Sequence, residues 1–508
     1  MALTIEQARD LADRLTEELN RRTPQAERLT DYYRGNHPLK FASREFARHF
    51  ADRYADFCDN WTAPVADVAV ERLTVVGVQP YGAETADVEL GRVWLANDLD
   101  ADSQLGFLSA GIGARAFVLV WGDPADETTP TVTFEDPTQA IVAYRAGSRR
   151  DRVAALKRWQ DGSTEFCTLY TADEVWKFER TSYRADQEAR KSLPLAAVDD
   201  LVRQWMPRDT GTEPNPLPNP MGVVPMVELP NRPLLADDPI SDVGGVAAMQ
   251  DAVNYLWALL FNSADFASLP ARVVTGADVP KTPILNEHGE IVGEKPVPLE
   301  KFALDRVLWI PDENAKISSW PAADLKAYTD VIEVAVGHIA AQTRTPAHYL
   351  IGKMANLSGD ALIAAEAGLV RRCEEKQLWF GQAIREVARL VALAQGDDRK
   401  AQALRAGTVL WADTESRSRA QLADALLKLK QIGFPFEFLA RQYGLTPPEV
   451  AVLVAMRERE AELDPVAQMM AGKPDPATDP TVPGADPAAD GGPMDQPRVP
   501  TTAAVAQG

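Results

Sequence analysis

The residue types best suited to chemistry gather in one short stretch, TRTPAHYLIGKMANLSGDALIAAE, at positions 343–366. This stretch lies between two segments whose apolar residues recur at helical spacing. Its candidate bases, nucleophiles and phosphate contacts are His348, Tyr349, Lys353, Asn356, Ser358 and Asp360. Three interpretations are open: an active-site loop, a loop that grips phosphate, or a loop that touches its target without chemistry.

Both enzymatic interpretations of this stretch meet physical objections. Ser358 directly precedes a helical segment, and an N-cap serine has its hydroxyl committed to backbone N–H groups instead of to a catalytic base. The pair Gly352-Lys353 is typical of phosphate-binding loops, but Met354 follows where Ser or Thr must hold magnesium. We therefore expect no catalytic residue in this stretch.

The remainder of the chain offers no stronger motif. GIGARAF at 111–117 precedes a predicted strand, whereas a dinucleotide-binding glycine loop follows one. Cys58, Cys167 and Cys373 are far apart and form no CxxC pair, so they predict neither a zinc site nor a disulfide framework. We expect a non-enzymatic protein with no cofactor and no metal.

Composition limits the class of partner. The 508 residues are 45% hydrophobic and 25% charged, as in soluble globular proteins, and the formal net charge is -21. A groove that grips nucleic acid needs Lys and Arg, so this charge argues against tight DNA binding and allows a protein that DNA passes without sticking. Plain solubility of an acidic protein is the favoured explanation of the charge. With no apolar run of about 18 residues and no signal-peptide core, we expect a soluble protein made in a cytoplasm.

The N-terminal part of the chain predicts an α+β region with a mostly antiparallel sheet. Leucines recur every four residues within the first 22 residues, which predicts a surface helix. Later segments such as TVTFEDPTQAIVAYR place β-branched and aromatic residues between turns, as strands do. Residues 208–239 are rich in Pro, Asn and Asp and predict a long connection that ends this region.

The pattern then becomes helical. Residues 240–266 carry one apolar stripe, whereas residues 322–343 are apolar on two faces and need neighbours on two sides. An insertion at 267–321 with strands and Pro-rich turns separates the two helices. Residues 358–395 lack proline and predict a rod of roughly 55 Å at ~1.5 Å per residue. Residues 463–508 hold nine of the 37 prolines and no aromatic residue, which predicts a disordered tail.

Five stretches occur in an order typical of one family. They are DYYRGNHPL at 31–39, NWTAPVADVAVERLTVVGV at 60–78, DVGGVAAMQDAVNYL at 242–256, TPAHYLIGKMANLSGDAL at 345–362 and WADTESRSRAQLADALLKL at 411–429. In this order they resemble the portal proteins of tailed bacteriophages, of the long-tailed type found in actinobacterial phages. The resemblance extends from about residue 28 to residue 460.

The resemblance implies a predominantly helical α+β fold with a wing, a stem, a clip, a tunnel loop and a small crown. The implied parts are an α+β wing at 1–239, stem helices at 240–266 and 322–343, a clip at 267–321, a tunnel loop at 344–357, a long wing helix with returning wing elements at 358–429, crown helices at 430–462 and the Pro-rich tail at 463–508.

The resemblance also implies an assembly and its partners. Such proteins form a homododecameric ring at one vertex of the capsid in the virion. Double-stranded DNA is packaged and ejected through the ring. The implied partners are the terminase large subunit, a head-completion or connector protein, and the major capsid and scaffolding proteins, with no membrane contact. The stretch at 343–366 would then touch DNA without chemistry.

Site residues follow from this assignment as expectations. We expect DNA-facing groups in the tunnel loop at His348, Tyr349, Lys353 and Asn356, hinges at Pro346 and Gly352, and subunit contacts at Val331, Ile332, Ile339, Val253 and Leu260. Acidic stem residues would repel phosphate if they faced the channel; they are Asp242, Asp251 and Asp265 on the first helix and Asp324, Asp330 and Glu333 on the second. A merely solvated face is an equal alternative for these charges.

Two other functions stay open on the sequence. One is a phage head-associated enzyme, either a maturation protease or a nuclease, which would need a nucleophile or a metal cluster. The other is a head-assembly component that does not form the DNA channel. Rings with a central hole would distinguish a portal from both.

Overall fold

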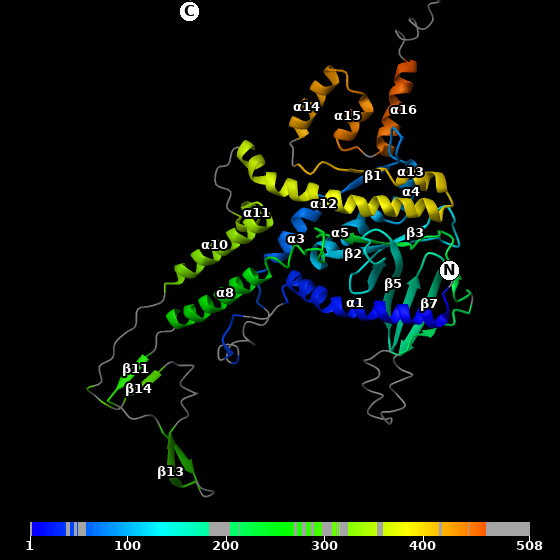
Figure 1. The fold of residues 1–508 in the computed structure, drawn as a ribbon. Coiled ribbons are helices and arrows are strands. Elements are labelled where there is room, and N and C mark those ends of the chain that lie inside the picture. Colours follow the sequence, from blue (N-terminus) through cyan, green and yellow to red (C-terminus); the bar gives the residue numbers. More distant parts are fainter. Residues whose placement is uncertain are drawn as a thin grey trace, which may run out of the picture. The chain divides into compact units, whose positions relative to one another are not determined.

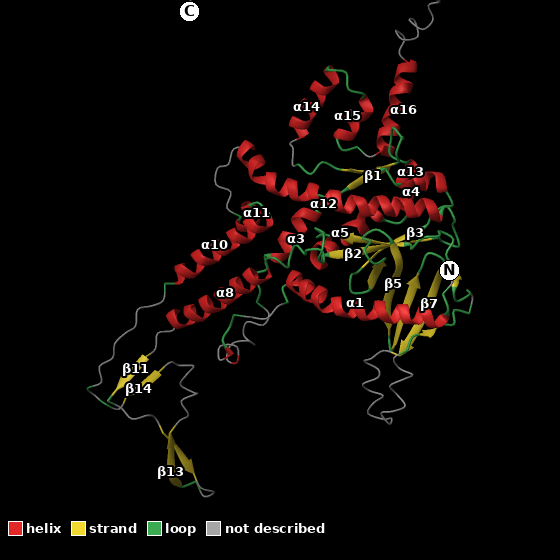
Figure 2. Ribbon diagram, in the orientation of Figure 1, coloured by secondary structure: helices red, strands yellow, loops and turns green. Residues whose placement is uncertain are grey.

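The computed structural model describes most of the chain. The described residues are 3–36, 41–44, 48, 57–181, 204–211, 213–268, 272–276, 281–285, 289–296, 307–310, 312, 314, 324–352, 359–415, 419–445 and 447–463. The chain divides into two compact units, residues 1–450 and 451–508. Helices and strands are mixed, as the sequence predicts (Figure 2).

The first helix is longer than its sequence pattern predicts. Helix α1 spans Ile5–Arg34, with Pro24 inside it, and ends where Gly35 adopts a left-handed φ of 79°. A capping box between Thr4 and Gln7 begins the helix, since each side chain bonds the backbone N–H of the other residue. The helix continues past residue 22 because tertiary packing also buries its later residues, such as Leu29.

The two largest sheets of the first unit are antiparallel. The three-stranded sheet has the order β10-β2-β3, and the larger sheet has the order β4-β5-β6-β7-β8, with β9 paired to β7. Their bounds are β2 Arg115–Trp121, β3 Thr131–Glu135, β4 Ala140–Tyr144, β5 Arg152–Asp161, β6 Thr164–Tyr170, β7 Glu174–Thr181, β8 Met206–Pro207, β9 Leu217–Pro218 and β10 Met226–Pro230. Helix α1 covers one face of the larger sheet, and its Leu19 shares a core cluster with Leu156 and Phe178 (Figure 1).

The longest helix forms the largest core. Helix α12 spans Gly359–Ala394, 36 residues, which agrees with the predicted rod. It packs on the three-stranded sheet and on the helices α3 (Thr62–Val70), α4 (Val88–Ala96) and α5 (Leu99–Gly113). Phe107 of α5 stacks on Phe380 of α12 with ring centroids 5.1 Å apart. Gly106 is required there, because a Cβ at this position would lie 2.0 Å from the ring of Phe134.

The two predicted stem segments contain a pair of helices. Helix α8 spans Ala247–Ser268 and helix α10 spans Leu325–Thr343, and the two lie side by side (Figure 1). Between them, β11 (Arg272–Thr275) pairs in parallel with β14 (Val307–Ile310), and β12 (Lys281–Leu285) pairs antiparallel with β13 (Ile291–Pro296). Helix α8 begins later than predicted because residues 242–246 form turns.

Shorter elements complete the described chain. They are α11 (Ala347–Ile351), α13 (Asp398–Leu404), β1 (Val75–Gln79), which pairs antiparallel with β15 (Thr408–Trp411), and then α14 (Arg419–Gln431), α15 (Phe436–Gln442) and α16 (Pro447–Leu463). The Pro-rich tail from residue 464 lies outside the described residues.

Candidate functional site

The predicted loop at 344–357 contains one turn of helix. Helix α10 ends at Arg344, whose backbone is left-handed (φ 55°) and donates to the carbonyls of the preceding turn. Pro346 stands at the N-cap of α11. Gly352 ends α11 with φ 67°, in the left-handed region that glycine tolerates best. The helical path is therefore broken at Pro346 and Gly352, and their role as hinges stays a prediction.

A polar network anchors the start of this loop to the body of the protein. The Tyr349 hydroxyl donates to Glu366 Oε1 of α12 over 3.1 Å and accepts from Arg72 Nη2 over 2.9 Å. Arg72 also pairs with Glu366 at 3.2 Å and donates through Nη1 to the carbonyl of Thr414 at 3.0 Å. His348 Nε2 lies 4.0 Å from Glu366 Oε1. The network joins the loop to α12, to the segment after α3 and to the chain after β15.

The network includes two of the residues expected to contact DNA. His348 and Tyr349 both have polar neighbours within the chain, and the His348 side chain is 11% exposed, so their contact with DNA stays a prediction. The single turn α11 directs both side chains toward Glu366. Lys353 and Asn356, the other two expected DNA contacts, lie outside the described residues.

The ionisation of the network favours its persistence. Burial would by itself lower the pKa of Arg72, but the nearby Glu366 carboxylate outweighs burial and the pKa is raised. Burial raises the pKa of Tyr349, and the hydrogen bond to Glu366 raises it further. The phenol therefore stays protonated at neutral pH and keeps donating to Glu366.

Helices α8 and α10 bury their main apolar stripes against each other. Val253 of α8 and Ile339 of α10 are fully buried, Ile332 is 6% exposed, and all three share one core cluster within the chain. These three side chains pack within the chain, and their expected role as subunit contacts stays a prediction. Leu260 is half-buried, and Val331 is 52% exposed.

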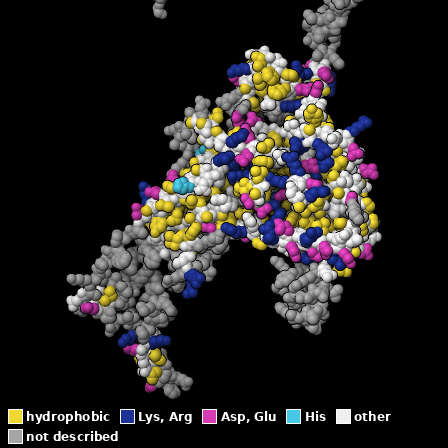
Figure 3. Space-filling model, viewed as in Figure 1, with side chains coloured by type: hydrophobic (Ala, Val, Ile, Leu, Met, Phe, Trp, Pro, Cys, Tyr) yellow, Lys and Arg dark blue, Asp and Glu magenta, His cyan; other side chains and the backbone are white. Residues whose placement is uncertain are grey.

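A second face of α10 stays outward. Val331 and Val334 are both more than half exposed, and the charged side chains of Asp330 and Glu333 are exposed beside them. Hydrophobic side chains gather on the surface over α8 and α10 (Figure 3). The two-faced pattern seen in the sequence therefore describes one face buried within the subunit and another available for contact.

A buried ion cluster joins α12 to the end of α10 and to the turn before α8. Lys376 of α12 donates to Asp242 Oδ2 at 2.6 Å, and Arg372, one turn earlier, lies 3.2 Å from the same oxygen. Arg372 also donates to the carbonyl of Thr343 at the end of α10 over 3.1 Å. The side chains of Asp242 and Lys376 are each 1% exposed. The end of α10 and the turn before α8 are thus both tied to α12.

The cluster keeps its aspartate ionised. Burial would raise the pKa of Asp242, but the charges of Lys376 and Arg372 outweigh it and lower the pKa to about 2. The sequence interpretation missed this cluster. The sequence feature that could have revealed the cluster is a pair of basic residues four positions apart, Arg372 and Lys376, in a long helix with a face that must be buried.

Comparison with known proteins decides the family. The model of the family "Phage portal protein, SPP1 Gp6-like" matches residues 12–442. The portal protein of Mycobacterium phage L5 is 29% identical over 377 residues, which cover 72% of this chain and 70% of that protein. The portal protein of Mycobacterium phage D29 is 28% identical over 433 residues, which cover 82% of this chain and 81% of that protein. The chain belongs to the phage portal protein family. Its members are structural proteins, and their known role is the channel for DNA packaging.

In this member of the portal family, two of the acidic residues singled out in the sequence are buried. For Asp242 and Asp251 the sequence left a channel-facing role and a solvated face open, and both side chains lie inside the chain. Asp251 accepts hydrogen bonds from the hydroxyl of Tyr32, and Asp242 belongs to the ion cluster. Because burial of a carboxylate requires partners, these two residues hold α8 and the turn before it to α1 and α12. Asp330 and Glu333 of α10 are exposed, and Asp265 of α8 is half-buried.

No group of three or more His, Cys, Asp or Glu side chains in the described part of this portal chain could hold a metal ion. None of the helices within the described ranges is both long and apolar enough to cross a membrane.

Proposed function

We propose that this chain assembles into a closed homododecameric ring at one vertex of the capsid, and that double-stranded DNA is packaged and ejected through its centre. The observation that carries the proposal is the family match over residues 12–442, supported by portal proteins of two mycobacteriophages that cover more than two thirds of the chain. The ring belongs to the virion and is made in the host cytoplasm.

The two stem helices support this proposal because one apolar face is buried within the subunit and another is exposed. Helices α8 and α10 bury a shared core, which makes them a two-helix unit, and Val331 and Val334 remain exposed. A head-to-tail contact that repeats around an axis places such a face against a different face of the next subunit and closes as a ring. We propose that Val331 and its exposed neighbours make that contact.

The loop after α11 is the proposed DNA contact. Tyr349, Arg72 and Glu366 hold the turn that precedes it, α11, against α12. One Lys353 per subunit would place a ring of positive charge inside an acidic assembly. Such charge attracts phosphate weakly, because salt screens it, and lets DNA slide. Asn356 would add a neutral hydrogen-bonding group.

The parts of the fold correspond to proposed roles. We propose that the α1–β10 body with α12 is the wing, that the small strand pairs β11–β14 and β12–β13 belong to the clip, and that α15 and α16 belong to the crown. The terminase large subunit, the head-completion or connector protein, and the capsid and scaffolding proteins are the proposed partners of the assembled ring.

Electron microscopy of the purified full-length protein tests the proposal. We expect rings with a central hole, and complementation of a phage that lacks its own portal should restore packaged heads. Small globular particles that never form rings, at any protein concentration or salt, would contradict it. A head-assembly component outside the channel would support capsid formation without being needed for DNA entry.

A further inference from the structure

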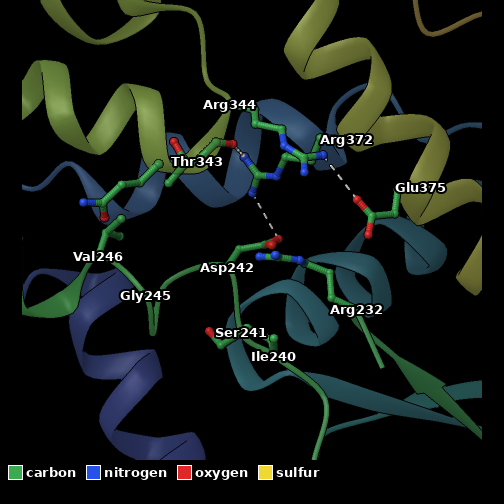
Figure 4. Close-up of a pocket in the computed structure, with 11 residues that line it drawn as sticks. Arg232, Ile240, Ser241, Asp242, Gly245, Val246, Thr343, Arg344, Arg372 and Glu375 are labelled. Carbon is green, nitrogen blue, oxygen red and sulfur yellow. Dashed lines mark hydrogen bonds and ion pairs between the residues drawn. The ribbon is translucent and has the colours of Figure 1, made fainter. Parts of the chain in front are cut away.

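A small basic pocket lies where both stem helices meet the wing. Its volume is about 210 Å³, and it is lined by the turn before α8, the end of α10, one face of α12 and the residues after β10. The guanidinium groups of Arg232, Arg344 and Arg372 come from three of these segments and turn toward the same space (Figure 4). Asp242 and Arg372 of the ion cluster form one wall of this space.

The charges around the pocket do not balance. Three arginines line it against two carboxylates, Asp242 and Glu375, and Lys376 lies behind Asp242. Asp242 is already shared between Lys376 and Arg372. Arg344 meets Glu375 at 3.5 Å in a pair whose side chains are 53% and 39% exposed, which is a weak contact. Within the described ranges, the Arg232 side chain makes no hydrogen bond or ion pair. The cationic side chains around the pocket therefore outnumber the carboxylates.

The backbone also presents these arginines in an uncommon way. Arg232 (φ 47°) and Arg344 (φ 55°) are two of four described non-glycine residues with positive φ. L side chains adopt this conformation at a cost, which glycine would avoid. At both positions the conformation turns a long cationic side chain toward the pocket.

We propose that this pocket receives a carboxylate side chain from a second copy of this chain. The proposal rests on the proposed ring, since only an assembly brings a second copy to this surface. The planar guanidinium group can donate two parallel hydrogen bonds to one carboxylate, and within the described ranges no other group accepts from the Arg232 guanidinium. The pairing would join the stem–wing junction of one subunit to an acidic surface of its neighbour.

The size and depth of the pocket favour a side chain over DNA. Arg372 is 5% exposed, so a phosphate on a rigid duplex cannot reach the inner wall, whereas a single Asp or Glu side chain can enter. The pocket is also smaller than typical small-molecule sites, which are roughly 300–1,000 Å³.

The charge of the chain favours a second copy as the source. Each copy carries 74 acidic and 53 basic side chains, so a neighbour presents carboxylates more often than cations. Copies with a net charge of -21 repel each other, and a ring needs specific sites that offset this repulsion.

Charge reversal tests the pocket on the full-length protein. Arg232→Glu and Arg344→Glu should each raise the protein concentration at which half of the chains are in rings by about tenfold or more. The matched control is Arg371→Glu, which changes a 76% exposed arginine of α12 outside the pocket lining. Native mass spectrometry measures the ring fraction, and thermal unfolding identifies variants that are merely unstable. Rings of both pocket variants as stable as those of the parent and the control would overturn the proposal.

A zero-length crosslink identifies the occupant directly. Arg344→Lys keeps the charge and supplies an amine, and a carbodiimide then joins it to a contacting carboxylate. We expect a crosslinked peptide pair between two copies, found by mass spectrometry of mixed isotope-labelled rings. A crosslink from position 344 to Glu375 within one copy and to no other copy would overturn the proposal.

The outcomes separate this inference from the proposed function. If the parent forms rings and packages DNA while Arg344→Glu also forms normal rings, only the inference fails. If Arg344→Glu forms normal rings but packages poorly, the pocket serves DNA phosphate and the inference is overturned. If the parent itself forms no rings, the proposed function fails first.

Discussion

Removing the buried lysine of the ion cluster gives the sharpest test of how the stem is held. Lys376→Met keeps most of the side-chain volume but deletes the charge that contacts Asp242 at 2.6 Å. Losing one partner of a buried pair costs about 3–5 kcal/mol in free energy of unfolding, because the other charge stays buried. Arg372 still lies 3.2 Å from the carboxylate, so we expect the lower end, about 3 kcal/mol.

The chain offers a matched control for this substitution. Lys428 contacts Asp424 at 2.7 Å, nearly the same distance, but its side chain is 71% exposed instead of 1%. Lys428→Met should therefore change the free energy of unfolding by only about 0.5 kcal/mol or less. Urea unfolding followed by circular dichroism, at matched oligomeric state, measures both variants. Equal costs for the two variants would refute the idea that burial makes the Asp242 pair a strong link.

The same pair predicts a dependence on acid. The folded pKa of Asp242 is about 2 and its ordinary value is 3.8, so the group contributes stability above pH 4 that is lost as pH falls toward 2. The shift corresponds to roughly 2 kcal/mol. Asp242→Asn should remove this part of the acid sensitivity. An unchanged pH profile between 4 and 2 in that variant would count against the assignment.

Four further outcomes are expected. Val331→Asp should give folded monomers in native mass spectrometry, and rings formed by this variant would exclude the exposed face of α10 as the subunit contact. Ile332→Asp should instead lower the free energy of unfolding by several kcal/mol, because the charge enters the chain's own core. Lys353→Glu should leave rings intact but impair packaging or DNA retention, and normal heads at normal rate would show that this charge is irrelevant. Tyr349→Phe should cost about 1–2 kcal/mol and speed hydrogen exchange in α11, since Arg72 and Glu366 lose a shared partner; unchanged exchange would contradict the anchor. Deleting residues 464–508 should leave folding and rings intact because their composition cannot offset ordering entropy, and loss of rings would show that the tail docks.

Local patterns in the sequence were sufficient for the main helices. Helical spacing of apolar residues predicted α8, α10 and the 36-residue α12, because each pattern reports a face that must leave water. Pro346 and Gly352 stand at the two ends of α11, since their backbone preferences act within one or two residues. Family membership was also readable, because it rests on ordered stretches spread along the chain.

Tertiary structure alone decided what each face and charge does. A stripe shows that Ile332 is buried but not whether its partner is α8 of the same chain or a neighbouring subunit. In the sequence, Asp242 is one of several acidic residues in a predicted stem segment. In the structure it forms a buried ion pair with Lys376, which lies 134 positions away. Periodicity is a property of one segment, whereas burial and pairing depend on which distant segments the fold brings together.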